Sequence, residues 1–173
     1  MRLILVPLLF GCLISLAQTK EYVCPPCNLP CDNVVHTKPG TCQSCHMTLV
    51  AKASVRYEDL SAEEFCERIA SNPNAVLLDV RSKGEFDGSR RNTYGHFKNA
   101  ININITELEQ RIGELEQYKD REILVYCSQS IRSPRAAIIL TEHGFNRVAN
   151  LSGGVSRMDA RGSDCLVERF VVH

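Results

Sequence analysis

The feature that most constrains the fold is a short apolar run that ends in a cysteine. The run from Ile123 to Tyr126 leads directly into Cys127, a polar loop follows, and a helical pattern extends from Pro134 to His143. An apolar run of this length, a loop and a helix predict a buried β-strand that feeds the N-terminus of a helix. Cys127 then stands at the carboxyl end of a strand, where ligands bind in open α/β sheets.

The rest of the chain repeats this alternation of strands and helices. We expect strands at 55–57, 75–80, 100–105, 123–126 and 148–151. An amphipathic helix is expected over 107–118, and another begins at Ser61, where Ser61 and Glu64 fit a capping box. Alternating strands and helices predict an α/β fold with a parallel sheet.

The position of Cys127 predicts a reactive thiol. Backbone N–H groups at a helix N-terminus favour negative charge, and Arg132 follows five residues later as the only formal charge in the loop. Both effects lower a thiol pKa and make the thiolate a usable nucleophile. The alternative interpretation is an inert buried cysteine, which is the usual fate of a free thiol.

Five blocks of sequence, in order, carry a family resemblance: Leu77–Arg81 with Glu85-Phe86, Gly95–Asn102, Tyr126–Ser133, Ala136–Phe145 and Leu151–Gly154. Through them, residues 55–162 resemble a single rhodanese (sulfurtransferase) domain, followed by a tail over 163–173. The resemblance implies the rhodanese-like three-layer fold with a central parallel sheet. It also implies that Cys127 carries a persulfide and passes its outer sulfur to a thiol or cyanide.

The resemblance also assigns roles around this cysteine. The Arg132 guanidinium and the loop backbone would stabilise the anionic sulfur, while Asp79 and Arg81 organise the surrounding loops. The loop residues that would provide the backbone contacts are Ser128, Gln129, Ser130 and Ile131. Four residues separate Cys127 from Arg132, whereas phosphatases that resemble this fold have five, so sulfur transfer is favoured over phosphate hydrolysis or thiol redox chemistry.

Two departures from the family pattern favour a second interpretation. Ser130 stands where the family usually has glycine, and it would be strained if the backbone there has a positive φ. The family's tryptophan after the Gly-Gly turn is absent, and Met158 lies near that place. The alternative function is therefore a metal-handling protein that uses a rhodanese-like domain as a docking scaffold.

The first seventeen residues have the pattern of an export signal. Met1-Arg2 precedes an apolar run that ends at Ala17, and fifteen residues are too few to span a bilayer comfortably. We expect cleavage after Ala17 and a periplasmic or secreted protein; a lipoprotein anchored at Cys12 is the alternative. No second apolar segment suggests a membrane span, and the balance of 20 Lys+Arg with 20 Asp+Glu argues against a nucleic-acid partner.

Residues 22–50 form a second unit that is rich in cysteine. Two Cys-x-x-Cys pairs, Cys24 with Cys27 and Cys42 with Cys45, predict one tetrahedral site for zinc or another soft metal such as copper. So short a segment cannot bury enough apolar surface to fold without such help. Disulfide pairing in an oxidising compartment is the alternative. Cys31, His36 and His46 are expected outside the ligand set.

A resemblance supports the metal interpretation. Tyr22-x-Cys24-Pro25 and the stretch from Lys38 to Leu49 are similar to the zinc-ribbon-like heavy-metal-binding module of copper-handling proteins. That module often has histidine where Cys27 stands and glycine where His46 stands. The resemblance implies a metal-handling protein as a partner. The role of Cys165, as a resolving thiol for Cys127 or as a plain cysteine, stays open.

Overall fold

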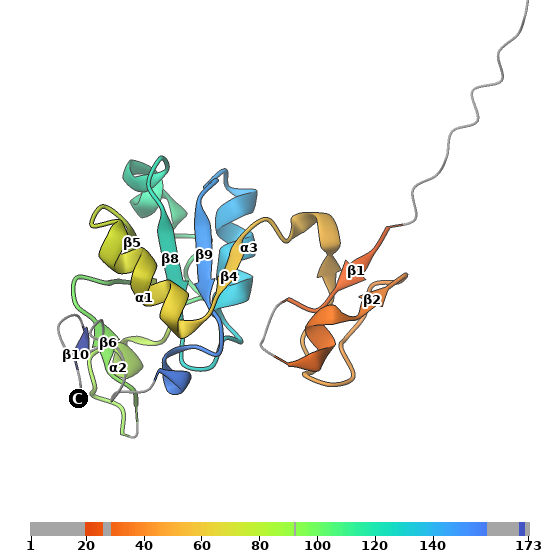
Figure 1. Cartoon of the computed structure of the whole chain (residues 1–173), viewed down its shortest axis with the longest axis horizontal. Coiled ribbons are helices and arrows are strands. Elements are labelled where there is room, and N and C mark those ends of the chain that lie inside the picture. Colours follow the sequence, from red (N-terminus) through yellow and green to blue (C-terminus); the bar gives the residue numbers. More distant parts are fainter. Residues whose placement is uncertain (1–19, 26–28, 92, 159–169, 172–173) are drawn as a thin grey trace, which may run out of the picture.

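The computed structural model describes residues 20–25, 29–91, 93–158 and 170–171 (Figure 1). The expected leader at 1–17, Cys12, Cys27 and Cys165 lie outside these residues. The described part of the chain contains a five-stranded sheet in the order β4-β9-β8-β5-β7, in which every neighbouring pair is parallel. Its strands are β4 (Glu58–Leu60), β5 (Val76–Asp79), β7 (Ile101–Asn102), β8 (Ile123–Tyr126) and β9 (Val148–Leu151).

The order of the strands creates a topological switch point between β5 and β8. From β5 the chain continues outward to the neighbouring edge strand β7, whereas from β8 it continues in the opposite direction to β9. Loops that leave the carboxyl ends of β5 and β8 therefore diverge, and such a point is the usual ligand site of open α/β sheets. Cys127 follows β8 and Arg81 follows β5 at this place.

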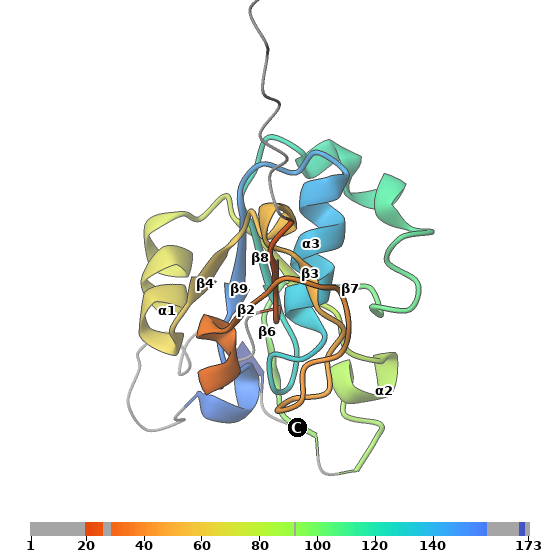
Figure 2. The same cartoon turned by 90° about the vertical axis from the view of Figure 1, so that its right-hand side faces the viewer.

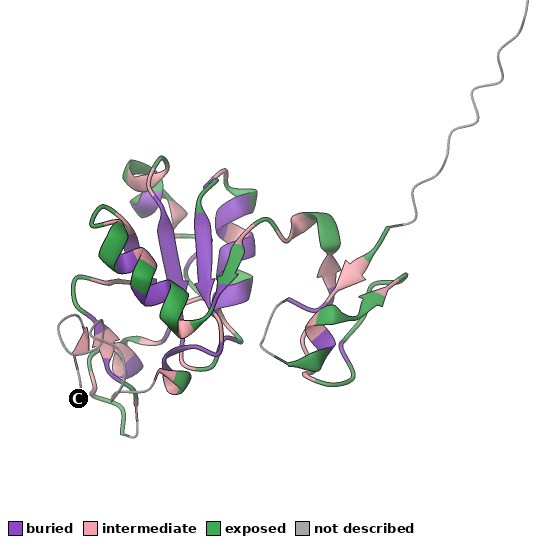
Figure 3. Cartoon of the chain, in the orientation of Figure 1, coloured by how far each residue is buried: buried purple, intermediate pink, exposed green. Residues whose placement is uncertain are grey.

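Both faces of the sheet are covered, as Figure 3 shows by the buried strands between helices. Along β8, Val125 belongs to the apolar cluster under α3 (Ser133–Glu142), and Tyr126 belongs to the cluster under α1 (Ala62–Ser71). Successive side chains of a strand point to opposite faces. Cys127 lies in the α3 cluster. Burial on both faces explains why the strand is continuously apolar.

The expected capping box at the start of α1 is confirmed. The Ser61 hydroxyl accepts a hydrogen bond from the Glu64 N–H at 3.2 Å, and the Glu64 carboxylate accepts one from the Ser61 N–H at 2.8 Å. Cys66, in the second turn of this helix, faces the core and is disulfide-bonded.

Three expected elements differ in extent or type. The first strand is Glu58–Leu60 rather than 55–57, because this register pairs Leu60 with Leu151 and buries it. The strand expected at 100–105 shrinks to Ile101–Asn102. The α-helix expected over 107–118 is a series of turns followed by the 3-10 helix η3 (Ile112–Tyr118), which contains Gly113, a poor helix former. Leu108 and Leu115 of this segment are nevertheless fully buried in the core.

The cysteine-rich segment forms a small sheet of its own in the described residues (Figure 2). Strands β1 (Tyr22–Val23), β2 (Val35–His36) and β3 (Val50–Ala51) are antiparallel, in the order β2-β1-β3. Between β1 and β2 lies the 3-10 helix η1 (Pro30–Asn33). The connecting helix η2 (Lys52–Ser54) packs against α3 and joins this module to the larger domain.

The segment expected as a C-terminal tail contributes to the fold. Strand β10 (Phe170–Val171) pairs antiparallel with β6 (His96–Phe97), and the rings of Phe170 and Phe97 meet edge to face at 5.2 Å. Among the described residues, no helix has the length and apolar character needed to cross a membrane.

Candidate active site and cysteine cluster

Cys127 lies at the focus of hydrogen-bond donors from its own loop. Its side chain is almost completely buried, and the Ser133 hydroxyl donates to its Sγ at 3.3 Å. Burial alone would raise the pKa of the thiol. Hydrogen bonds from the Ser133 hydroxyl, and from the backbone N–H groups of Ser133, Arg132 and Gln129, outweigh burial and lower the pKa below its ordinary value. The loop thus favours a thiolate.

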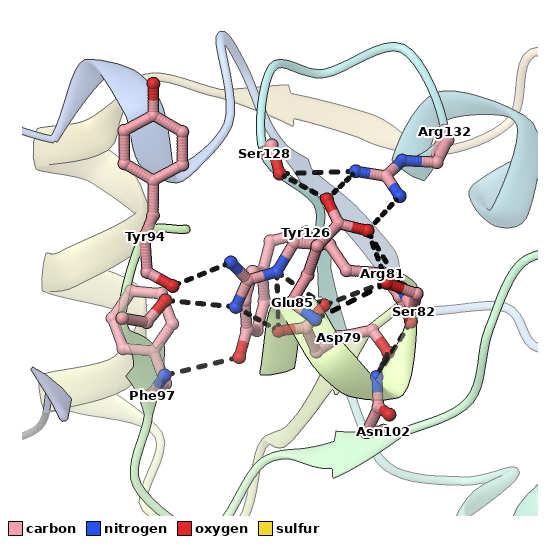
Figure 4. A network of polar contacts seen from close by, with 11 residues as sticks. Asp79, Arg81, Ser82, Glu85, Tyr94, Phe97, Asn102, Tyr126, Ser128 and Arg132 are labelled. Atoms are coloured by element: carbon pink, nitrogen blue, oxygen red, sulfur yellow. Dashed lines mark hydrogen bonds and ion pairs between the residues drawn. The ribbon is translucent and has the colours of Figure 1, made fainter. Parts of the chain in front are cut away.

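Arg132 does not stand alone in the loop. Its guanidinium donates two parallel hydrogen bonds to the Glu85 carboxylate, both at 2.8 Å, and Figure 4 shows the Ser128 hydroxyl bridging the two side chains. Arg132 holds the pKa of Glu85 far below its usual range. Sequence reasoning gave Glu85 no role. The sequence signal that could have located Glu85 is the capping box Ser82-x-x-Glu85, which opens α2 (Lys83–Phe86).

Asp79 and Arg81 form a fully buried ion pair behind the loop. The Arg81 guanidinium reaches the Asp79 carboxylate at 2.6 Å and also donates to the carbonyls of Tyr94 and Gly95, both at 3.0 Å. Asn102 donates to the carbonyls of both Asp79 and Arg81 (Figure 4). The pair therefore ties the loop before β6 to the end of β5.

The Gly153-Gly154 turn supports the loop from the other side. Gly154 has φ +65, and a Cβ atom there would lie 2.5 Å from the carbonyl carbon and oxygen of Ser128. The next two N–H groups, of Val155 and Ser156, donate to the carbonyls of Cys127 and Ser128 at 3.0 and 2.9 Å. Only glycine allows this close approach.

Four thiols gather in the N-terminal module: Cys24, Cys31, Cys42 and Cys45. Their Sγ atoms lie within 4.8 Å of one another, and none of the four is joined in a disulfide. A tetrahedral zinc site with bonds of about 2.3 Å places sulfurs about 3.8 Å apart, so the arrangement fits such an ion. Three of the four expected ligands are thus brought together.

The expectation that Cys31 lies outside this cluster is wrong. Pro30 starts the 3-10 helix η1, which turns Cys31 inward and buries it beside Cys24. Cys27 lies outside the described residues. Among the described residues, η1 thus brings Cys31 into the same cluster as Cys24. The second pair forms the expected knuckle, with the His46 N–H donating to the Cys42 carbonyl at 3.0 Å.

The second knuckle also activates a thiol. Backbone N–H groups of Cys45 and Ser44 lower the pKa of Cys42 to about 7. His46 has φ 58, in the left-handed region that glycine adopts most freely. Met47 packs against the buried cysteines, as expected of an apolar residue.

A cleft of about 650 Å³ lies between the module and the loop that follows Cys127. His46 and Met47 line it from the module, and Ile131 and Arg132 line it from the loop. Ile131 is 54% exposed at the tip of this loop. The described residues that line the cleft do not include Cys127.

The model of the rhodanese-like domain matches residues 61–160, more than half of the chain. The chain belongs to the rhodanese-like domain family. The match covers the strands β5, β7, β8 and β9 of the central parallel sheet and the loop after β8, whereas β4 and the cysteine-rich module precede it.

Relatives with this domain differ in name and length. The chain is 38% identical over 98 residues to the uncharacterized protein YqhL of Bacillus subtilis (strain 168), covering 57% of this chain and 69% of that protein. It is 31% identical over 88 residues to the tRNA uridine(34) hydroxylase of Cronobacter sakazakii, covering 49% of this chain but only 24% of the hydroxylase.

Solved structures with a rhodanese-like domain are also similar. The solution structure of this domain from the Anabaena Alr3790 protein has a TM-score of 0.51 and 26% identity, covering 61% of this chain and 75% of that one. The crystal structure of reduced Bacillus anthracis CoADR-RHD has a TM-score of 0.52 and 30% identity, covering 66% of this chain and 18% of that one.

Proposed function

We propose that the protein is an exported sulfurtransferase that carries sulfur as a persulfide on Cys127 and passes it to a thiol or cyanide. The observation that carries the proposal is the convergence of donors on the buried Cys127 sulfur. A loop that lowers the pKa of a thiol also suits a terminal persulfide sulfur, which carries the same negative charge. Arg132 is the only residue of the loop with a formal charge, so no carboxylate of the loop opposes the anionic sulfur.

The proposed reaction has two displacement steps. In the first, the Cys127 thiolate attacks the outer sulfur of a donor such as thiosulfate; an S–S bond forms, and the donor remnant leaves with the electron pair of its broken bond. In the second, the acceptor attacks the outer sulfur, and the electron pair of the S–S bond returns to Cys127 as thiolate. The loop N–H groups hold the negative charge at both stages.

The test is thiosulfate:cyanide turnover by the purified mature protein and by Cys127→Ser. We expect ping-pong kinetics, no turnover by the variant, and one added sulfur atom on the Cys127 peptide after donor alone. Ser133→Ala is a graded comparison because it removes one donor to the sulfur and keeps the nucleophile. Full turnover by Cys127→Ser would contradict the proposal.

For the N-terminal module we propose a site for zinc or another soft metal such as copper, held by Cys24, Cys31, Cys42 and Cys45. The mutual proximity of their Sγ atoms supports it. A structural zinc ion contributes on the order of 10 kcal/mol of folding free energy, which a unit with so small a core needs.

The experiment is metal analysis of the full chain purified without oxygen, with Cys31→Ser and Cys27→Ser as a matched pair. We expect about one metal ion in the wild type and in Cys27→Ser, and loss of the ion in Cys31→Ser. The opposite pattern would restore the paired-knuckle ligand set.

Export is part of the same proposal. The disulfide at Cys66 supports it, because such bonds persist in oxidising compartments. The mass of the N-terminal peptide of the exported protein distinguishes cleavage after Ala17 from lipidation at Cys12.

The alternative function, a metal-handling protein with a docking domain, predicts that Cys127→Ser leaves metal transfer to a partner unchanged. Balanced charge gives no reason to propose a nucleic-acid partner.

A further inference from the structure

Asn150 connects the catalytic loop to a neighbouring strand from inside the sheet. It lies on β9, fully buried, and its Nδ2 donates to the Ser130 hydroxyl at 2.9 Å and to the Asp59 carboxylate at 2.5 Å. Asp59 is the residue of β4 that pairs with Asn150 in the parallel ladder. The contacts therefore run from an edge strand, through the sheet, to the centre of the loop.

Ser130 needs such a contact. Its φ is 55, in the left-handed region that glycine adopts freely and other residues adopt only under strain. Its side chain is completely buried, so its hydroxyl has no access to water. Without a partner, the serine would be both strained and unsatisfied, and a different backbone conformation would become competitive.

The orientation of the Asn150 amide is fixed by charge. Turning the amide over would place its carbonyl oxygen against the Asp59 carboxylate, which repels it. In the observed orientation Nδ2 serves both acceptors, while Oδ1 is buried and has no hydrogen-bond partner among the described residues. In this orientation the hydrogen bond from Nδ2 to the Ser130 hydroxyl is kept, and Oδ1 has no hydrogen bond among the described residues.

We propose that Asn150 is a positioning residue for sulfur transfer: it compensates for serine at position 130 and keeps the loop N–H groups aimed at Cys127. Ser130 lies between Gln129 and Arg132, whose N–H groups both reach that sulfur. A change of φ at Ser130 rotates the adjacent peptides and moves these donors away. This role rests on the proposed function only where turnover is measured. The alkylation rate of Cys127 reports the loop geometry without any sulfur transfer.

The test compares wild type, Asn150→Ala, Ser130→Gly and the double variant by the pH profile of iodoacetamide alkylation at Cys127. We expect Asn150→Ala to move the profile to higher pH and to slow alkylation at neutral pH on the order of tenfold, as for a shift of one pKa unit. Ser130→Gly is the background in which Asn150→Ala is repeated. The double variant should have the same profile as Ser130→Gly, because glycine adopts this φ without a tether.

Two further variants keep the result unambiguous. Asn72→Ala removes an amide that donates to the Glu122 carboxylate at 2.8 Å, at the opposite end of the sheet, so it controls for a loss of stability alone. It should leave alkylation of Cys127 unchanged. Asp59→Ala, at an exposed position, removes the anchor of the amide and should cause a smaller shift, which Ser130→Gly also cancels.

The proposal would be overturned if Asn150→Ala lowered reactivity equally in the wild-type chain and in the chain that carries Ser130→Gly. If Asn150→Ala does not fold, the same comparison is made with Asp59→Ala. Alkylation needs no sulfur donor, so its outcome stands whether or not the protein transfers sulfur. Where turnover is measured, we expect kcat/KM for thiosulfate to follow the alkylation rate across the four proteins.

Discussion

The loop over residues 128–132 is held by an ion pair between two elements. Glu85 comes from α2 after β5, and Arg132 stands at the start of α3 after β8, on the two sides of the switch point. Two parallel hydrogen bonds fix the guanidinium plane of Arg132 relative to the carboxylate plane of Glu85, which a single hydrogen bond would not do. Arg132 therefore acts on Cys127 as a part of a rigid assembly and less as an isolated cation.

Replacement of Arg132 tests this geometry. We expect Arg132→Ala to lower kcat/KM for thiosulfate by roughly tenfold to a thousandfold, the range for loss of one preorganised charged group. Arg132→Lys keeps the charge but cannot form the paired hydrogen bonds to Glu85, so it should rescue only part of the loss. Complete rescue by lysine would show that charge alone matters. Steady-state kinetics, with circular dichroism as a folding control, measures the result.

Glu85 should make stability depend on pH in a specific direction. Its hydrogen bonds with Arg132 hold the pKa of the folded carboxyl below its ordinary value of 4.5. As the pH falls, the unfolded chain binds this proton first, so the contribution to the free energy of unfolding is complete above about 4.5 and declines through the lowered folded pKa. We expect Glu85→Gln to cost about 1–2 kcal/mol at pH 7, and the difference from wild type to shrink in acid.

Urea denaturation of both proteins at pH 7 and at pH 3 measures this difference. Glu114→Gln is a matched control, because Glu114 also pairs with an arginine but is exposed. It should change the free energy of unfolding little at either pH. A constant difference for Glu85→Gln across this range would exclude titration of Glu85 as its cause.

At the scale of the elements, the Gly-Gly turn and the loop behave as one unit. Gly154→Ala would place a Cβ 2.5 Å from the Ser128 carbonyl, so we expect a displaced loop and a loss of turnover of at least tenfold. Gly113→Ala is the matched control, because nothing lies within 4 Å of its Cβ position. It should keep full turnover and gain slightly in stability. Similar losses in both variants would contradict the close approach.

The sequence predicted those elements whose local signals agree with their packing. Cys127 at the end of β8, the start of α3 and the Ser61 cap were all found, because apolar period, loop and cap point to one answer there. The first strand was misplaced by three residues because its position depends on register with β9, a long-range contact. Glu85 and Asn150 were missed for the same reason, since each acts through a partner distant in sequence. Cys31 was missed because the 3-10 helix that begins at Pro30 turns it into the cluster.

On the scale of the whole molecule, the two units have separate cores. The module packs around its cysteines, whereas the rhodanese-like domain packs on the two faces of its sheet. We expect removal of metal with a chelator to raise amide exchange over 20–51 and leave 58–158 protected. Hydrogen exchange read by mass spectrometry, together with persulfide formation on Cys127, tests this. Loss of protection across the sheet would show that the two units fold together.

The pairing of Arg132 with Glu85 also bears on how substrates arrive. A lone guanidinium beside the nucleophile would draw anions from a distance, and dissolved salt would weaken that attraction. Here the positive charge is matched by a carboxylate 2.8 Å away, so these two side chains present no net charge to the surrounding solution. This ion pair should therefore neither speed the arrival of thiosulfate nor make it depend on dissolved salt. It gives an inorganic anion no advantage over a neutral persulfide carrier in reaching Cys127.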